Sequence, residues 1–315
     1  MKKIPVFYSE ECCAPRGSSR SPSMQKPALA VRSWQERGFA IDLYTPSAAS
    51  LKELKAAHDR DFVDGVLCGR IDNGFGNRDV DITRSLPYTS GAMMDAARYV
   101  VNHGPGSIAC APVSGFHHAG WSNAGGFCTF NGLMVAALSV LDTAKYLGKP
   151  DLKVGILDYD MHYGDGTVDI LDALGRTTRE RIKHRTFGGD IMPAQSHRQG
   201  NDRERALAAE SVMEIPATLR AWKAEGVGLV LYQAGADPHV NDPLGGVLTS
   251  AQLAHRDELV FETCKELQLP VAWCLAGGYM EDKSKPAEDI YARIRPTLDI
   301  HDNTMRACMQ VYCDD

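Results

Sequence analysis

The segment GILDYDMHYGDGT, residues 155–167, is rich in side chains that bind metals or transfer protons. Asp158, Asp160, His162 and Asp165 follow directly after an apolar run. Asp160 and His162 are two residues apart, so in an extended chain their side chains point to the same side and can reach one point. A carboxylate oxygen and an imidazole nitrogen at one point suit a divalent cation of the zinc or iron type. The alternative is a loop in which these side chains cap the next helix.

A second polar loop, YQAGADPHVNDPLGG, follows another apolar run at residues 232–246. Asp237 comes just past the end of that run and could supply a third metal ligand, with one coordination position left for water. Asp237 and Asp242 each precede a proline, where aspartate also commonly starts turns. Because two such loops would meet at one edge of a sheet, the metal site is favoured.

Adjacent histidines in a third loop, GFHHAG, are candidates for proton transfer. Hydrolysis of an amide by a metal-activated water needs a base for the water proton and an acid for the departing amine. His117 and His118 could serve both steps if their pKa values differ. Asp158 and Asp165 are then candidates to orient the two rings. Hydrogen bonding within the loop is the alternative for this pair.

Two glycine-containing motifs complete the set of candidate residues. In AGGYM, Gly277 and Gly278 allow close backbone approach, and the phenol of Tyr279 could donate to a developing oxyanion. In WSNAGGFCTFN, Gly126 and Phe127 could form one wall of a narrow apolar tunnel, although a phenylalanine is more often a core residue.

All of these motifs follow short apolar runs, which indicates the elements that position them. The runs are continuous, as in strands covered on both faces of a parallel sheet. Segments with helical spacing lie between them, and Thr249 and Gln252 form a candidate capping box. The order predicts an α/β fold with one domain over residues 1–315, an open and mostly parallel sheet sandwiched by α-helices. Ligands of such sheets bind at the carboxyl ends of the strands. We expect strands within residues 4–9, 107–115, 153–160, 227–237 and 269–279, helices at 89–101 and 131–147, and long loops at 14–27 and 70–81.

Composition narrows the class of protein further. The chain has 315 residues, 44% of them hydrophobic, and a formal net charge of −6 without a basic block, which argues against a nucleic-acid partner. The N-terminal apolar run is too short for a signal peptide and no later run is long enough to span a membrane, so we expect a cytoplasmic protein without a membrane partner. The nine cysteines form no C-x-x-C pair and are expected to be free thiols. Nothing in the sequence specifies the oligomeric state.

Together and in this order, the motifs resemble those of the histone deacetylase superfamily, which includes bacterial lysine deacetylases, acetylpolyamine amidohydrolases and acetoin-utilisation-type proteins. The resemblance runs from AHDRDFVDGVL at 57–67 to HDNTMRA at 301–307. It implies the arginase/deacetylase fold and a zinc ion on Asp160, His162 and Asp237, with ferrous iron as the alternative metal.

The resemblance also implies roles for the remaining candidates. His117 and His118 would be the proton-handling pair, oriented by Asp158 and Asp165, and Tyr279 would be the oxyanion donor. Asp158 would also belong to a structural potassium (K+) site. The residues that would line the substrate tunnel are Gly126, Phe127, Leu244, Gly277 and Gly278.

The chain departs from the family pattern at several positions. It has Tyr163 where many members have a second histidine, AGGY in place of GGGY, and no HPE motif in its N-terminal loop. The region after RIKHRTFGGD, 181–190, does not match the family's loop, which leaves the second tunnel wall and the other potassium ligands unassigned. Gly164 and His239 stand where a binuclear, arginase-type site needs further acids, so one metal ion is favoured over two.

These observations predict a zinc-dependent deacetylase that removes an acetyl or another short acyl group from an amine. Its substrate would be a peptide with acetyl-lysine or a small acetylpolyamine. Leu244, at a position where polyamine-selective relatives can place an acid, favours a neutral substrate, whereas acids in the loops could attract a polyamine or be solvated surface charge. These acids are Glu10, Glu11, Asp72, Asp79 and Asp81. The alternative from another class is a non-catalytic or regulatory protein that binds acylated ligands on the same fold.

Overall fold

The strands form one seven-stranded parallel sheet in the order β2-β1-β3-β7-β6-β4-β5. The structure is a computed structural model that describes residues 2–14, 21–146, 148–191 and 200–313. The strands are β1 (Ile4–Phe7), β2 (Ile41–Tyr44), β3 (Ile108–Ala111), β4 (Lys153–Asp158), β5 (Ile182–Thr186), β6 (Val227–Gly235) and β7 (Val271–Ala276). The fold class expected from the alternation of strands and helices is thus confirmed.

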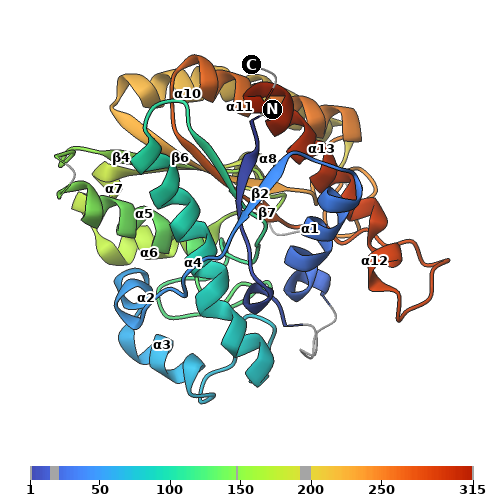
Figure 1. Cartoon of the computed structure of the whole chain (residues 1–315), viewed down its shortest axis with the longest axis horizontal. Coiled ribbons are helices and arrows are strands. Elements are labelled where there is room, and N and C mark those ends of the chain that lie inside the picture. Colours follow the sequence, from blue (N-terminus) through green and yellow to red (C-terminus); the bar gives the residue numbers. More distant parts are fainter. Residues whose placement is uncertain (1, 15–20, 147, 192–199, 314–315) are drawn as a thin grey trace.

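Helices cover both faces of this sheet (Figure 1). Helices α1, α9, α10, α11 and α13 pack on one face, and α2 to α6 pack on the other. The α-helices are α1 (Lys26–Glu36), α2 (Leu51–Ala57), α3 (Arg60–Leu67), α4 (Val80–His103), α5 (Gly132–Ala144), α6 (Asp165–Leu174), α7 (Arg176–Arg181), α8 (Phe187–Ile191), α9 (Asp202–Met213), α10 (Ile215–Ala224), α11 (Ser250–Glu266), α12 (Ile290–Arg293) and α13 (Arg295–Cys313).

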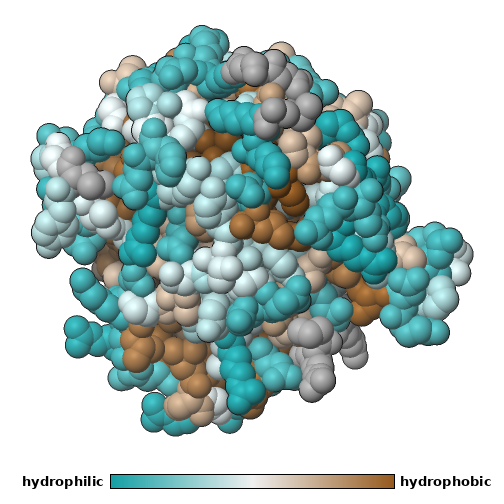
Figure 2. Space-filling view, viewed as in Figure 1, coloured by the Kyte–Doolittle hydropathy of each residue, from teal (hydrophilic) through white to brown (hydrophobic). Residues whose placement is uncertain are grey.

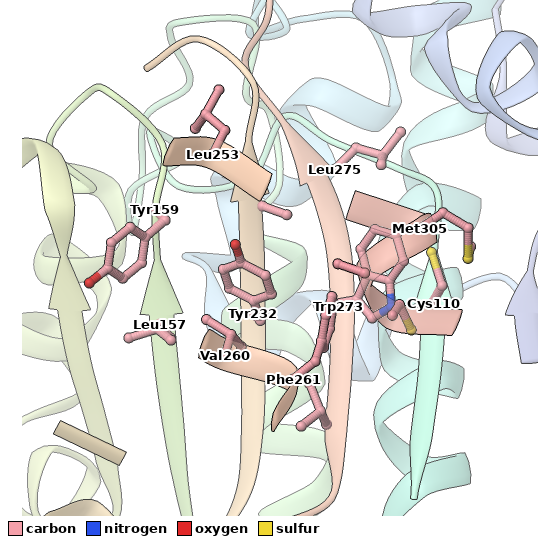
Figure 3. Packing of buried hydrophobic residues seen from close by; sticks show 14 of the residues in the cluster. Cys110, Leu157, Tyr159, Tyr232, Leu253, Val260, Phe261, Trp273, Leu275 and Met305 are labelled. Carbon is pink, nitrogen blue, oxygen red and sulfur yellow. The ribbon is translucent and has the colours of Figure 1, made fainter. Parts of the chain in front are cut away.

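The central strands are apolar on both sides because each side chain meets one of the two helical layers. In β4, Ile156 belongs to the core on the α5 side, while Leu157 belongs to the core on the α11 side. Figure 3 shows the second of these cores, where Phe261 of α11 lies against Tyr232 and Trp273 of the neighbouring strands. Continuous apolar runs therefore predicted the central strands correctly.

The two edge strands, β2 and β5, were not predicted from the sequence. β2 is short and mostly exposed, and β5 has the sequence IKHRT, in which only Ile182 is fully buried. A strand at the edge of a sheet, or with partial cover, needs no continuous apolar run, so the criterion that found the central strands misses it.

Helix boundaries differ from the expected ones where a cap decides them. α4 begins at Val80 rather than near residue 89, because the side chain of Asp79 accepts hydrogen bonds from the N–H groups of Asp81 and Ile82. The loop predicted at 70–81 therefore ends at Asp79. The capping box of Thr249 with Gln252 at the start of α11 is confirmed. The loop predicted at 14–27 lies partly outside the described residues, and its described end forms a short 3-10 helix, Pro22–Met24.

The face in Figure 2 is mainly polar, with separate hydrophobic patches between the polar side chains. All nine cysteines are free, as expected. Among the described helices, none combines the length and the apolar character that a membrane span needs.

Candidate active site

The order of the strands brings the candidate residues to one edge of the sheet. Strands β3, β7, β6 and β4 are consecutive neighbours, and the loops after their carboxyl ends carry the histidine pair, the AGGY turn, Asp237 and the DYDMH segment, respectively. One narrow pocket at this edge is lined by residues of the histidine loop, the AGGY turn and the DYDMH segment. Asp237 is fully buried and does not line this pocket.

Asp160, His162 and Asp237 meet as the sequence predicts. Their ligand atoms all lie within 4.8 Å of one another. His162 Nδ1 is 3.0 Å from Asp160 Oδ1 and 2.9 Å from Asp237 Oδ2. Both carboxylates are buried, and His162 is half-buried at the pocket.

The charges of this group fit a cation. Burial, together with the negative charge of Asp160, raises the pKa of Asp237 to about 7. Burial alone would lower the pKa of His162, but its hydrogen bonds and charge interactions with the two carboxylates raise that pKa to about 11. Two buried carboxylates therefore favour a positive charge between them. Two carboxylate oxygens and one imidazole nitrogen are also a donor set of a catalytic zinc site, which keeps a position open.

Each histidine of the pair contacts the carboxylate proposed to orient it. His117 Nδ1 lies 2.8 Å from Asp158 Oδ2, and His118 Nδ1 lies 2.6 Å from Asp165 Oδ1. Because an ionised carboxylate can only accept, Nδ1 of each ring is the donor and Nε2 is left for other partners. The ring centroids are 4.1 Å apart, so both imidazoles can act on one bound group.

The two histidines differ in pKa. Burial would lower the pKa of His117, but Asp158 and Asp160 outweigh it and raise that pKa to about 9. The pKa of His118 is lowered, first by burial and then by the charge of His117, although Asp165 opposes this. At neutral pH these shifts favour a protonated His117 and a neutral His118, so His118 is the ring that can accept a proton.

Tyr279 is placed by its backbone and stays neutral. Its N–H donates to Asp242 Oδ2 at 2.7 Å, and the N–H of Leu244 donates to Asp242 Oδ1 at 2.9 Å. The ammonium of Lys26, which is fully buried, donates to the carbonyl oxygen of Gly277 in the same turn. Burial raises the pKa of Tyr279 well above its usual range, so its phenol remains a hydrogen-bond donor.

Glycine is required at Gly277 because the turn lies directly against the carboxylate of Asp237. A Cβ at this position would overlap the carboxylate of Asp237, and its φ is +30°. Gly278 has a different environment: its missing Cβ faces Ala236 and Thr297, and it does not belong to the residues that line the described pocket. The assignment of Gly278 to the substrate tunnel stays a prediction.

Gly126 and Phe127 line the pocket, and their place in a substrate tunnel stays a prediction. The Phe127 and Tyr279 ring centroids are 5.9 Å apart across the pocket. Phe127 has a φ of +63°, a left-handed conformation that is strained for a residue other than glycine and is typical of functional positions. A Cβ on Gly126 would overlap the ring of His118.

The pocket has a small inner part and a wider mouth. The inner part has a free volume of about 20 Å³, enough for about one water molecule. The mouth, with a volume of about 360 Å³, is lined by His118, Asp165 and Leu244, among others. The region after residue 190, where the sequence leaves the second tunnel wall unassigned, lies partly outside the described residues.

Several supporting residues were missed from the sequence. Gln233 donates to Asp158 Oδ1 at 2.8 Å, and its only signal is its position in β6, directly beside Asp158 in the neighbouring strand. His58 lies 2.7 Å from the carbonyl oxygen of Gly120 and accepts from Asn131 N at 2.9 Å, which secures the histidine loop. The potassium site near Asp158 stays a prediction.

The contacts of Asp242 lead to a prediction about stability. We expect Asp242→Asn to reduce the free energy of unfolding by about 1–3 kcal/mol, because one carboxylate oxygen becomes an NH2 group that cannot accept from the part-buried N–H of Tyr279 or Leu244. Urea denaturation of the metal-free protein measures the change. Asp282→Asn is the matched control, since Asp282 accepts hydrogen bonds from Ser284 in an exposed turn. Equal stability of the two variants would contradict the role of Asp242.

Comparison with known proteins places these features in a family. A model of the histone deacetylase domain matches residues 20–179, about half of the chain. Among curated proteins, the chain is 29% identical over 296 residues to an uncharacterized protein of Picosynechococcus sp. and covers 93% of it. It is 29% identical to histone deacetylase 2 of Arabidopsis thaliana over 56% of this chain but covers only 45% of that protein. It is 23% identical to the acetoin utilization protein AcuC of Bacillus subtilis, over 80% of this chain and 70% of the relative.

Solved structures share the fold. The chain superposes on acetylpolyamine aminohydrolase from Burkholderia pseudomallei with a TM-score of 0.67 and 18% identity, covering 98% of this chain and 99% of the other. The HD domain of HDA15 also gives a TM-score of 0.67, with 20% identity over 98% of this chain and 95% of the other. At these identities the likeness establishes the fold alone, the arginase/deacetylase type expected from the motifs.

Proposed function

Because the chain belongs to the histone deacetylase family, we propose that it is a zinc-dependent amidohydrolase that removes an acetyl or another short acyl group from an amine. The observation that carries this proposal is the convergence of three kinds of group at one pocket. These are the ligand set of Asp160, His162 and Asp237, the carboxylate-bound histidine pair, and the neutral phenol of Tyr279.

A zinc ion held by Asp160, His162 and Asp237 would polarise the acyl carbonyl and lower the pKa of a water molecule. The protein supplies the proton transfers. His118, which is neutral, accepts a proton at Nε2 from the attacking water and later gives it to the departing amine. His117 stays protonated beside Asp158 and stabilises negative charge in the pocket. This assignment rests on the opposite directions of the two pKa shifts.

Tyr279 acts on the substrate oxygen. Its phenol donates a hydrogen bond that strengthens as the carbonyl oxygen becomes negative, and such donors lower the barrier of acyl transfer. The backbone of this turn is held by the contacts of Asp242 with the N–H of Tyr279 and of Lys26 with the carbonyl oxygen of Gly277.

Two features favour acetyl-lysine over a polyamine as the substrate. Leu244, an apolar residue, lines the mouth. Acids of the nearby loops already have local partners: Asp72 pairs with Arg78 at 2.6 Å, Asp79 caps α4, and Glu10 accepts from Tyr8. A cationic polyamine would therefore find few free carboxylates there. The small inner volume also favours a short acyl group.

Acetate release from a matched panel tests this proposal. The zinc-loaded protein is given an acetyl-lysine peptide, acetylputrescine, acetylcadaverine and acetylspermidine at equal concentrations. We expect the highest kcat/KM on the peptide. Turnover confined to the amines would contradict the substrate assignment and keep the reaction type. Stoichiometric zinc without turnover on any short acyl amide would instead support a non-catalytic protein that binds acylated ligands.

A further inference from the structure

Arg256 of α11 is an unusual residue, a guanidinium with no exposed surface. Moving such a charge from water into the interior is costly unless it is paired and its donors are used. None of the steps proposed above involves Arg256. Its contacts nevertheless lead directly to the two segments that carry the carboxylate ligands of the metal centre.

The pairing of β4 with β6 ends just before these ligands. The last paired residues are Asp158 and Gln233, and the N–H of Tyr159 donates to the carbonyl oxygen of Gln233 at 3.0 Å. Beyond this point the strand pairing stops, and the two segments continue to Asp160 and Asp237. A buried carbonyl group there needs a donor from elsewhere.

Arg256 supplies that donor to both segments. Its Nη1 lies 2.7 Å from the carbonyl oxygen of Gly235 and 3.3 Å from the carbonyl oxygen of Tyr159. Tyr159 directly precedes Asp160, and Gly235 lies two residues before Asp237. One nitrogen atom thus contacts both segments just beyond the last paired residues of β4 and β6.

The guanidinium is itself fixed in place. Asp257 Oδ1 accepts from Arg256 Nε at 2.9 Å and lies 2.8 Å from Nη2. The same carboxylate accepts from the hydroxyl of Tyr232 and, at 2.6 Å, from that of Thr304 on α13. In Figure 3, Tyr232 lies on the face of the sheet that α11 covers. Arg256 therefore cannot follow a movement of one segment without losing its partners.

The two segments are in direct contact at this point. A Cβ on Gly235 would lie 2.6 Å from both the Cα of Asp160 and the carbonyl oxygen of Tyr159, and 3.0 Å from Asp237 Oδ1. A small displacement of either segment would consequently change the separation of the two carboxylates. Metal affinity depends on that separation.

We propose that Arg256 is a positioning residue of the metal centre, which joins the carbonyl groups of Tyr159 and Gly235 so that Asp160 and Asp237 keep the spacing of a single cation. This inference rests on the proposed function, because it concerns the same metal ligands. A purely structural ion pair of Arg256 with Asp257 would affect stability alone. The positioning role also predicts a loss of metal affinity.

Zinc affinity of matched variants tests the proposal. Arg256→Met combined with Asp257→Asn removes the buried charge pair without leaving one charge alone. We expect zinc affinity, measured by competition with a chromophoric chelator, to fall about 10- to 100-fold. In Arg256→Lys, whose side chain ends in a single ammonium group, zinc affinity should fall less than in the double variant. The d–d absorption of the cobalt-substituted double variant should differ from that of the parent protein.

Arg295→Met is the control, because Arg295 on α13 also pairs with a buried carboxylate, Asp302, and its other hydrogen bonds go to Ser33, Tyr291 and Asp299. It should lower thermal stability and leave zinc affinity close to that of the parent. Zinc affinity and cobalt spectra that are unchanged in the Arg256 variants, with a similar loss of stability, would overturn the proposal.

Hydrogen exchange of the metal-free proteins gives a readout that does not depend on zinc. Peptides that cover residues 157–163 and 234–240 should exchange faster in the double variant than in Arg295→Met, with other strands unaffected. Equal exchange in these peptides would overturn the positioning role. A parent protein that binds no zinc would overturn the proposed function instead, so the two failures are distinguishable.

Discussion

Asp237→Ala is expected to abolish zinc binding and amide hydrolysis together. The carboxylate of Asp237 lies 2.9 Å from His162 Nδ1 and completes, with Asp160 and His162, a group of ligand atoms that could hold a metal ion. Asp160 and His162 alone leave a site with two ligands, whereas catalytic zinc normally has three protein ligands. Metal analysis by mass spectrometry should find almost no zinc, and acetate release should fall to background.

The metal-free Asp237→Ala protein should remain folded. Burial and the charge of Asp160 raise the pKa of Asp237 to about 7, which means that its ionised form is disfavoured without a cation. Removing the carboxyl group relieves this repulsion but also removes the acceptor of the Met161 N–H and the partner of His162, so the Tm of the metal-free variant is measured beside its zinc content. Asp172→Ala, an exposed change on α6, is the control and should keep full zinc content. Full zinc content in Asp237→Ala would contradict the ligand assignment.

Tyr279→Phe should keep the metal and lose most of the activity. The phenylalanine ring preserves the contact with Phe127 and the backbone bond to Asp242, but the donor to the oxyanion is gone. Loss of one such donor typically lowers kcat about 10²- to 10³-fold. Steady-state kinetics on the best substrate of the panel, together with the zinc content, measures the effect.

KM should change little in this variant, because the hydrogen bond is made mainly in the transition state. Tyr291→Phe is the matched control, since Tyr291 lies on α12 and its hydroxyl donates to Glu36 at the surface. Turnover of Tyr279→Phe equal to that of the control would refute the oxyanion role.

The residues of the candidate site could be predicted because of where they stand in the chain. Asp160, His162, Asp237 and the histidine pair all follow continuous apolar runs, and parallel strands bring the residues after their carboxyl ends to one edge of the sheet. The type of fold followed from the same runs. The roles assigned to the individual residues remain predictions that the variants above test.

The supporting contacts were beyond prediction because they join distant parts of the chain. Lys26 donates to Gly277 across 251 positions, and Arg256 contacts Tyr159 across 97. Neither residue lies in a motif. Because lysine and arginine on a helix are usually exposed, the sequence alone predicts a surface position for both. A pair of glycines likewise does not reveal which of the two lines the pocket, as Gly277 does.

Acetate release with controlled metal content tests the central claim most directly. The purified protein is stripped with a chelator, assayed on the acetyl-lysine peptide, and assayed again after one equivalent of zinc is restored, with ferrous iron added anaerobically in a parallel sample. We predict no turnover of the stripped protein and recovery with zinc. Undiminished turnover of protein shown to contain no metal would contradict the account.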